Sequence, residues 1–332
     1  MPGLDIFSSD AFSLTTLTER INKMDFQPGL IGSLGLFAEK GVTTTSIEVE
    51  EKNGTLRLIP TNPRGAPPFV QARDRRTVRL FKIPQIQKYD RVYADQVQNI
   101  RSFGSDTDTQ TVQALVDELL AQMGAEVEMT IEHLRVGALQ GNILDSDGST
   151  VIYNLFTEFG VSQLTAAITF SSAATEIRNQ LVAAKRLIEA DLGGVPVTGY
   201  AAIVSPEFFD ALVAHATVKE AYKYQQGNQL QADLRESGFV YAGISFREYR
   251  GSIGATPYIA ASTGYMYPTG PNLFATYFAP GDFVETVNTI GLPMYSKTAP
   301  DPEFNRWVSI LVQSNPLPLA LRPRSILKLT MN

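Results

Sequence analysis

The chain has two histidines, His133 and His215, and these side chains are the best suited to proton transfer or metal binding at neutral pH. His133 follows Glu132 directly, and Glu128 lies four residues before Glu132, so the sequence contains neither an HExxH motif nor the ExxH spacing of carboxylate-bridged metal sites. We therefore predict that His133 lies on the polar face of a helix, as a surface or inter-subunit residue and not a ligand. His215 is predicted to lie late in a helix that starts at Ser205, where an imidazolium suits the negative end of the helix dipole.

Asp145, Asp147 and Gly148 resemble the start of a calcium-binding loop, but the glycine stands at the fourth position instead of the sixth and no glutamate follows at the twelfth. Residues typical of strands flank Asp147-Gly148, which predicts a hairpin with a primed turn. The sequence has no GxSxG motif, no P-loop motif and no cysteine, so disulfides, thiolate ligands and cysteine nucleophiles are excluded. We therefore predict that the protein is not an enzyme and has no catalytic residue, cofactor site or metal site.

The composition is that of a folded globular protein, with 44% hydrophobic and 19% charged residues in a chain of 332. This length suits roughly two domains. No stretch approaches the roughly 18 consecutive apolar residues that a membrane span needs, and the N-terminal sequence lacks the basic and apolar regions of a signal peptide. The net charge of −6 argues against a nucleic-acid-binding protein, because such a domain carries a basic footprint.

Residues 41–91 carry strand and turn signals but few side chains that could form a core. Apolar and acidic residues alternate from 47 to 50, Asn53-Gly54 is a strong signal for a tight turn, and the alternation resumes from Leu56 to Leu58. An isolated hairpin is only marginally stable. We therefore expect another molecule to cover this one.

Charge is distributed unevenly along the same part of the chain. Residues 64–91 carry eight basic and two acidic side chains, a local charge of +6, whereas residues 1–51 carry eight acidic and three basic ones, a local charge of −5. Segments of opposite sign could bind each other between copies of the chain and fix their register; a solvated surface with uneven charge is the alternative. The residues predicted to make these inter-subunit contacts are Arg73, Arg75, Arg76 and Arg79 on one side and Glu48, Glu50 and Glu51 on the other.

A long helix is predicted from about 109 to 140, because apolar residues recur there at steps of three and four. Asp106 and Asp108 suit its start and Gly141 its end. About 30 residues make a helix about 45 Å long, which suits a structural spine. Late strands are expected to pair with elements near residue 100. The other expected elements are a helix at 173–191, a strand at 200–204, a helix starting at Ser205-Pro206, strands at 239–249, 257–261 and 272–278, a strand from about 306 to 314 and another closing at about 325–330, with a break between them.

Three stretches and the order of the elements resemble the major capsid protein E family of tailed bacteriophages, the lambda-like group, over nearly the whole chain. The stretches are DGSTVIYNLFTEFGV (147–161), VSPEFFDAL (204–212) and WVSILVQSNPLPLALRPRSILKLT (307–330). The resemblance implies an α+β fold of the Hong Kong 97 type. It implies an N-terminal arm at 1–40, an extended β-hairpin loop at 41–91, a peripheral lobe at 92–194 and 300–332 that contains the spine helix, and an axial α/β lobe at 195–299.

The resemblance also implies a structural role with no cofactor. Copies of the chain would assemble in the host cytoplasm, as pentamers and hexamers, into the icosahedral head of a virion that encloses double-stranded DNA. An acidic chain repels phosphate, so DNA would be a neighbour by non-specific proximity only. Separate scaffold and portal proteins are expected, a decoration protein is left open, and no membrane partner is expected.

Three alternatives remain at this point. A nanocompartment shell would use the same fold for a protein cargo. A hydrolase would need a convergent polar cluster in residues 195–299, where the sequence shows only scattered Tyr and Asp. A DNA-binding protein would use the basic stretch 64–91 and would bind with a steep dependence on salt.

Overall fold

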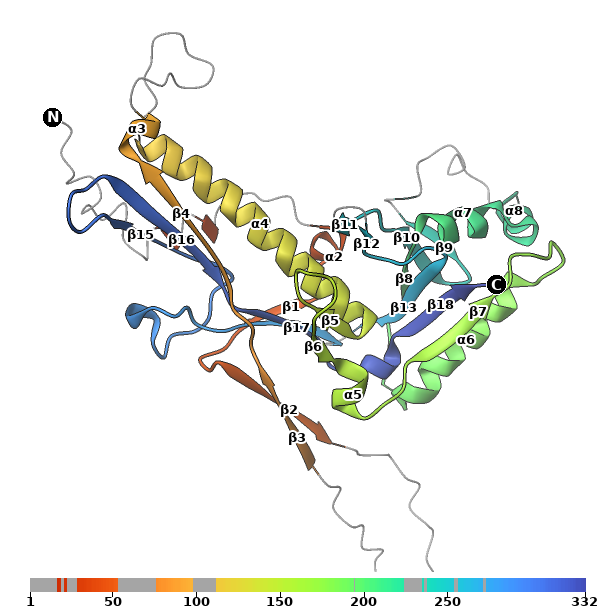
Figure 1. The fold of residues 1–332 in the computed structure, drawn as a ribbon. Coiled ribbons are helices and arrows are strands. Elements are labelled where there is room, and N and C mark those ends of the chain that lie inside the picture. Colours follow the sequence, from red (N-terminus) through yellow and green to blue (C-terminus); the bar gives the residue numbers. More distant parts are fainter. Residues whose placement is uncertain are drawn as a thin grey trace, which may run out of the picture.

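The computed structural model describes residues 17–18, 21–22, 29–52, 76–97, 112–193, 195–223, 235, 238–253, 256–270 and 273–332. An elongated lobe contains the longest helix, and a compact lobe is built on a six-stranded sheet. A two-stranded ribbon projects from the region between the lobes (Figure 1). Within the described ranges, no helix is long and apolar enough to cross a lipid bilayer.

The longest helix, α4 (Val112–Gln140), confirms the predicted spine over the part of it that the structure describes. The helix ends directly before Gly141, which has a φ of 82°. A Cβ at this position would lie 2.2 Å from the Phe156 ring, so only glycine fits here. The apolar residues that form the buried stripe of its first half are Val116, Leu120, Met123, Val127 and Ile131.

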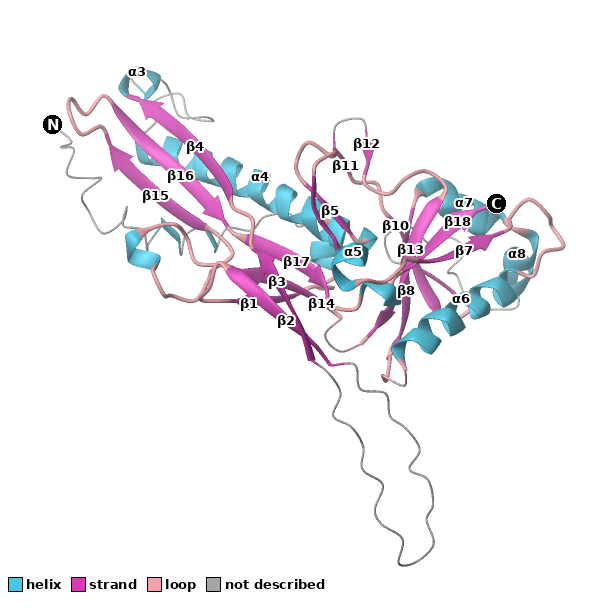
Figure 2. Ribbon diagram, turned by 60° about the horizontal axis from the view of Figure 1, so that its bottom comes forward, coloured by secondary structure: helices cyan, strands magenta, loops and turns pink. Residues whose placement is uncertain are grey.

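α4 packs on a three-stranded antiparallel sheet in the order β15 (Tyr295–Pro300), β16 (Trp307–Ser314) and β4 (Ile86–Tyr93) (Figure 2). β16 pairs with β4 along its full length. The prediction that late strands return to elements near residue 100 is therefore confirmed. A second three-stranded sheet has the order β1 (Ala38–Gly41), β14 (Phe274–Phe278) and β17 (Pro316–Ala320).

Part of the predicted N-terminal arm belongs to the core of the elongated lobe. Leu17 and Ile21 are fully buried in the apolar cluster formed by α4, β4 and β16. The Asn22 side chain donates to the carbonyl of Met294 at 2.8 Å and accepts from its N–H at 3.2 Å. The short helix α2 (Leu30–Ser33) follows and leads into β1.

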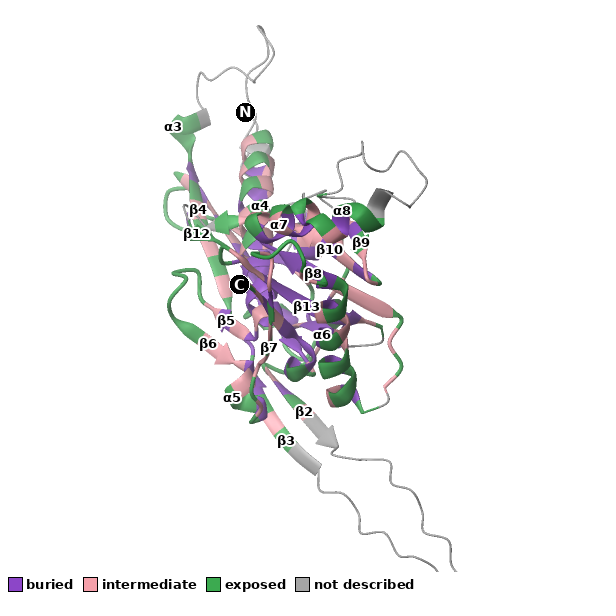
Figure 3. Ribbon diagram, turned by 90° about the vertical axis from the view of Figure 1, so that its right-hand side faces the viewer, coloured by how far each residue is buried: buried purple, intermediate pink, exposed green. Residues whose placement is uncertain are grey.

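The compact lobe is built on a mixed sheet. Its order is β7 (Leu164–Ile168), β18 (Leu327–Met331), β13 (Thr263–Thr269), β8 (Gly199–Val204), β10 (Ile244–Glu248) and β9 (Phe239–Tyr241). Helices α6 (Ile177–Leu192) and α7 (Pro206–Ala214) share one apolar cluster with this sheet, and α8 (Ala216–Lys223) follows α7. Figure 3 shows this interior as a continuous buried region beside α4, with the outer side of α6 exposed.

The sheets do not follow the predicted boundaries at 194/195 and 299/300. β7 and β18, which the prediction assigned to the peripheral lobe, pair within the six-stranded sheet, while β14 and β15 pair in the elongated lobe. The reason is burial: Leu327 and Leu329 of β18 join the apolar cluster that also contains Met266 of β13.

Two of the predicted strands and one turn differ from the structure. The stretch 239–249 is a hairpin, because Ala242 and Gly243 both have positive φ (51° and 73°) and reverse the chain between β9 and β10. The expected strand 257–261 is reduced to β12 (Thr256–Pro257), which pairs with β11 (Ser252–Ile253). The hairpin at Asp147-Gly148 is confirmed, but its turn is not of the primed type. The Gly148 N–H donates to the Asp145 carbonyl, so the central residues are Ser146 and Asp147, and neither has positive φ.

The remaining elements are short. They are β5 (Asn142–Leu144) and β6 (Val151–Asn154) of that hairpin, α3 (Ala94–Val97), α5 (Leu155–Phe159), and the 3-10 turns η4 (Val284–Thr286) and η5 (Pro323–Ser325).

Candidate assembly surfaces

The projecting ribbon consists of β2 (Ser46–Lys52) and β3 (Arg76–Lys82), which pair antiparallel with Ile47 opposite Phe81. The predicted return strand at 56–58 and its turn at Asn53-Gly54 lie outside the described residues. The described partner of β2 is β3, which lies farther along the chain than the predicted return strand.

The inner face of the ribbon is attached to α5 and β6 by aromatic packing. Phe81 is fully buried, and its ring centroid lies 5.3 Å from that of Tyr153 and 5.8 Å from that of Phe159. The Tyr153 hydroxyl accepts a hydrogen bond from the backbone N–H of Lys82 (2.8 Å) and donates to its carbonyl (2.9 Å). These contacts fix the direction in which the ribbon leaves the body.

Arg79 belongs to the same attachment. Its guanidinium donates to the carbonyls of Glu158 (2.7 Å) and Phe159 (3.2 Å) and lies 5.1 Å from the centre of the Phe159 ring. A cation at the carbonyl end of a helix is a favourable placement. Arg79, which the sequence assigned to inter-subunit contact, therefore has hydrogen-bond partners within its own chain.

The outer face of the ribbon exposes Glu48, Val78 (53% exposed) and Leu80 (65% exposed). Of the other predicted contact residues, Arg73 and Arg75 lie outside the described residues. The structure describes only the backbone of Glu50, Glu51 and Arg76, which takes part in the β2–β3 ladder. The inter-subunit pairing of these acidic and basic residues therefore stays a prediction.

A second exposed surface, which the sequence did not predict, lies on the face of the β4–β16 sheet away from α4. The Arg91 guanidinium lies over the rings of Tyr89 (5.3 Å) and Trp307 (5.2 Å). Hydrogen bonds from Ser309 and from Arg91 lower the pKa of Tyr89. Trp307 is only half-buried, because the alternation along β16 places it on this outer face opposite Tyr93.

A buried polar cluster joins α4 to α2 and to the compact lobe. The Glu132 carboxylate, 5% exposed, accepts hydrogen bonds from the backbone N–H groups of Ile31 (2.8 Å) and Gly32 (3.0 Å) and from the Tyr249 hydroxyl (2.8 Å). Gly29 is needed beside it, because a Cβ there would lie 2.3 Å from Glu132. One carboxylate thus accepts hydrogen bonds from N–H groups in the first turn of α2, which have no partner within the helix. The same carboxylate binds Tyr249, directly after β10.

Both histidines are buried and structural. His133 was predicted on a polar face, but its ring is packed against Tyr258 and its Nε2 lies 3.0 Å from the Asp145 carbonyl, to which it donates. The helix has no exposed face at this point, because residues 131–139 are all buried. His215 directly follows α7, and its Nε2 donates to the Ser172 carbonyl at 3.0 Å.

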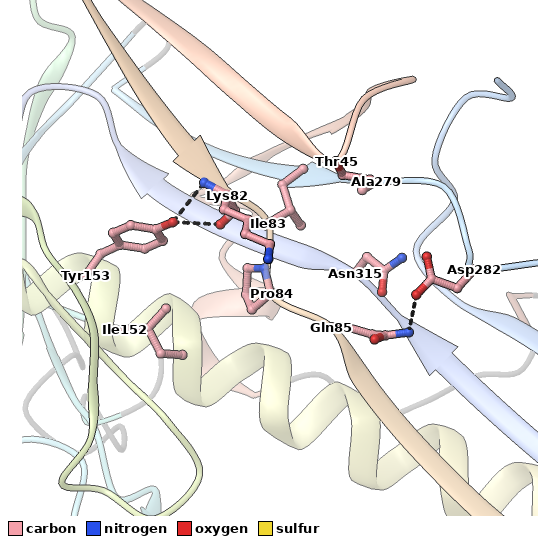
Figure 4. A pocket seen from close by; sticks show the side chains of 10 residues that line it. All are labelled: Thr45, Lys82, Ile83, Pro84, Gln85, Ile152, Tyr153, Ala279, Asp282 and Asn315. Carbon is pink, nitrogen blue, oxygen red and sulfur yellow. Dashed lines mark hydrogen bonds between the residues drawn. The ribbon is translucent and has the colours of Figure 1, made fainter. Parts of the chain in front are cut away.

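A groove of about 500 Å³ lies where the ribbon joins the body, between the segment 82–85, β6 and the segment before η4 (Figure 4). Pro84 and Ile152, both half-buried, supply apolar surface, whereas Ile83 is only 7% exposed. Lys82 lies on the Tyr153 side, and Asp282 lies on the opposite side, where its carboxylate accepts a hydrogen bond from Gln85 at 2.8 Å. The remaining lining residues are Thr45, Ala279 and Asn315.

Comparison with protein families identifies the kind of protein that carries these surfaces. The model of the family described as "Phage major capsid protein E" matches residues 13–331. The chain belongs to this family. The chain is 29% identical over 339 aligned residues to the major capsid protein of Pseudomonas phage KPP10, a match that covers 96% of each chain. It is 22% identical to that of Salmonella phage Felix O1, covering 86% of this chain and 87% of the relative.

Solved structures with the same fold are capsid proteins as well. The capsid of cyanophage P-SCSP1u has a TM-score of 0.58 at 11% identity, covering 93% of this chain and 90% of that one. A putative capsid protein of a prophage of E. coli CFT073 has a TM-score of 0.58 at 13% identity, covering 96% of this chain and 99% of that one. The predicted family and the predicted α+β Hong Kong 97-type fold are therefore confirmed, and the protein is a structural component of a phage capsid.

A pH dependence of the capsid protein's stability follows from Glu128, one turn before Glu132. Burial raises the pKa of Glu128; Arg135 lowers it, and the carboxylates of Glu39 and Glu132 raise it further. A raised pKa in the folded state means that folding favours the protonated carboxyl. The contribution of Glu128 to stability is therefore fully present below its unfolded pKa, about 4.3, and is lost as the pH rises through the folded value.

Glu128→Gln is accordingly expected to raise the free energy of unfolding at pH 7 and to leave it nearly unchanged at about pH 3–4. Urea unfolding of both chains at the two pH values measures this difference. Glu118→Gln, on the exposed side of the same helix, is the matched control and should change little at either pH. A gain from Glu128→Gln that is larger in acid than at neutral pH would contradict the expectation.

Proposed function

We propose that this chain builds an icosahedral phage head as pentamers and hexamers that enclose double-stranded DNA. The observation that carries the proposal is the ribbon β2–β3, which is held rigidly at its base and presents Val78 and Leu80 to solvent. Apolar side chains on a projecting strand pair are an aggregation hazard unless a neighbour covers them. In a shell, the next copy does so, and the interface repeats under symmetry.

The elongated lobe would form the peripheral part of each capsomer and the compact lobe its axial part. Assembly would take place in the host cytoplasm with separate scaffold and portal proteins, and a decoration protein could bind outside. The chain would act without catalysis or a cofactor, through surface complementarity alone. Its net charge of −6 suits a wall along which DNA moves without binding.

The first experiment is the particle size of the purified chain, by sedimentation and negative-stain microscopy at rising protein concentration. Rings or closed shells are the expected result, because the interfaces lie on the chain itself. A chain that stays monomeric at every concentration, both alone and with its scaffold protein, would contradict self-assembly.

Reversing two charges tests the predicted electrostatic contact. Arg75→Glu combined with Arg76→Glu is expected to abolish shells and to leave a folded, soluble chain, since like charges across an interface repel. The matched control is Arg178→Glu combined with Lys219→Glu, which makes the same change of charge at exposed positions of α6 and α8. Normal particles from the Arg75/Arg76 variant would refute the contact.

A further inference from the structure

The loop 301–306, between β15 and β16, holds an aromatic side chain out into solvent. Phe304 is 67% exposed, and the Arg306 guanidinium lies 4.9 Å from the centre of its ring. Asp301, 3% exposed, accepts from the backbone N–H groups of Glu303 (3.2 Å), Phe304 (3.3 Å) and Arg306 (3.3 Å). One buried carboxylate thus fixes the loop before any partner arrives.

Such a loop has the properties of an interface anchor. An aromatic ring buries about 150–250 Å² when a partner covers it. Aromatic and arginine side chains dominate the energetics of protein interfaces. Because Asp301 already orders the backbone, little conformational entropy remains to be lost on binding.

The groove at the base of the ribbon matches this loop in charge and in polarity. Along the loop, the acidic Glu303 precedes Phe304 and the basic Arg306 follows it. In the groove, Lys82 lies beside the apolar surface of Pro84, and Asp282 lies on the side away from Tyr153 (Figure 4). A ring placed over that surface would bring each charge of the loop to the opposite charge of the groove.

The loop and the groove of one copy cannot meet. They lie at opposite ends of β16: the loop leads into Trp307, whereas Asn315, directly after Ser314, lines the groove. Eight residues of strand separate the two ends, which corresponds to roughly 25 Å at about 3.3 Å per residue. The contact therefore needs a second copy. Because two different surfaces meet, it is head-to-tail, which is the kind of contact that closes rings.

We propose that the loop 301–306 of one capsid subunit docks in the ribbon-base groove of its neighbour, with Phe304 over Pro84, Glu303 at Lys82 and Arg306 at Asp282. The docking rests on the proposed function, since it requires that copies assemble. It makes the groove a specific inter-subunit site, and it couples the tip of one elongated lobe to the direction of the next subunit's ribbon.

A charge exchange tests the pairing. Glu303→Lys and Lys82→Glu each replace an exposed side chain and are each expected to lower the yield of particles at least about fivefold through like-charge repulsion. The double variant, Glu303→Lys with Lys82→Glu, is expected to restore the yield, because the pair is re-formed with reversed sign. Single variants that assemble as well as the parent chain, or a double variant no better than the worse single one, would overturn the docking.

The absence of cysteine from the chain allows a second readout. Glu303→Cys combined with Lys82→Cys, treated with a short bis-maleimide after assembly, should give covalent ladders of subunits. Glu303→Cys combined with Leu187→Cys, which is exposed on α6, is the matched control and should not. Particles without ladders from the first pair overturn the docking but leave the proposed function intact. A parent chain whose copies never associate overturns both.

Discussion

Phe81→Ala is expected to remove about 3–5 kcal/mol of stability from the base of the ribbon, as is usual for a phenylalanine deleted from a packed site. Phe81 is fully buried and its ring packs against those of Tyr153 and Phe159, so its removal leaves a cavity at the base of the ribbon. The direction of the ribbon would then be lost together with the packing. We therefore expect no closed shells from this variant, although the compact lobe should remain folded.

Urea unfolding, limited proteolysis of the ribbon and electron microscopy together measure this effect. Leu80→Ala is the matched control, because Leu80 is the neighbour on the outer face and is 65% exposed. It should change the free energy of unfolding by no more than about 0.5 kcal/mol. If Phe81→Ala and Leu80→Ala unfolded at the same urea concentration, the ribbon would not be anchored as described.

Glu132→Ala is expected to destabilise the chain by about 3–5 kcal/mol, because three donors lose a shared acceptor and each buried donor left unsatisfied costs about 1–3 kcal/mol. The amides of Ile31 and Gly32 and the hydroxyl of Tyr249 would each lose their acceptor in a site closed to water. α2 would detach from α4, and the compact lobe would lose its polar contact with the spine. Urea unfolding measures the loss.

Tyr249→Phe measures the contribution of the Tyr249 hydroxyl alone to this loss of stability. It removes one donor and leaves the carboxylate bound to the two amides, so the expected cost is about 1–2 kcal/mol. Combining it with Glu132→Ala should add less than its own cost, because the hydroxyl has no acceptor left in that background. A Glu132→Ala chain within 0.5 kcal/mol of the parent would contradict a structural role for the carboxylate.

What the sequence predicted correctly depends on short-range signals. The spine α4 follows from its apolar spacing, and the start of α7 from Ser205, whose side chain accepts from the N–H of Phe208 as an N-cap should. The hairpin around Gly148 follows from a turn signal that is local in the same sense. Such elements are decided by residues within a few positions of one another.

What the sequence missed depends on contacts between distant residues. The pairing of β2 with β3 was not predicted, and β18 inserts between β7 and β13 across a predicted boundary. No local motif distinguishes Glu132 from an exposed helical glutamate. Its hydrogen-bond donors lie 100 and 101 positions earlier and 117 positions later in the chain. The turn at Ala242-Gly243 was missed because alanine is rarely found at positive φ.

The side-chain bonds between Asn22 and the backbone of Met294 join positions 272 residues apart. At about 5–20 residues per second, a ribosome needs roughly 15–50 s to travel from one to the other. During this time Leu17 and Ile21 lack the strand β16 against which they are buried. The subunit therefore cannot complete its elongated lobe while it is being translated. A nascent chain therefore cannot be incorporated into a shell until nearly all of it has been synthesised.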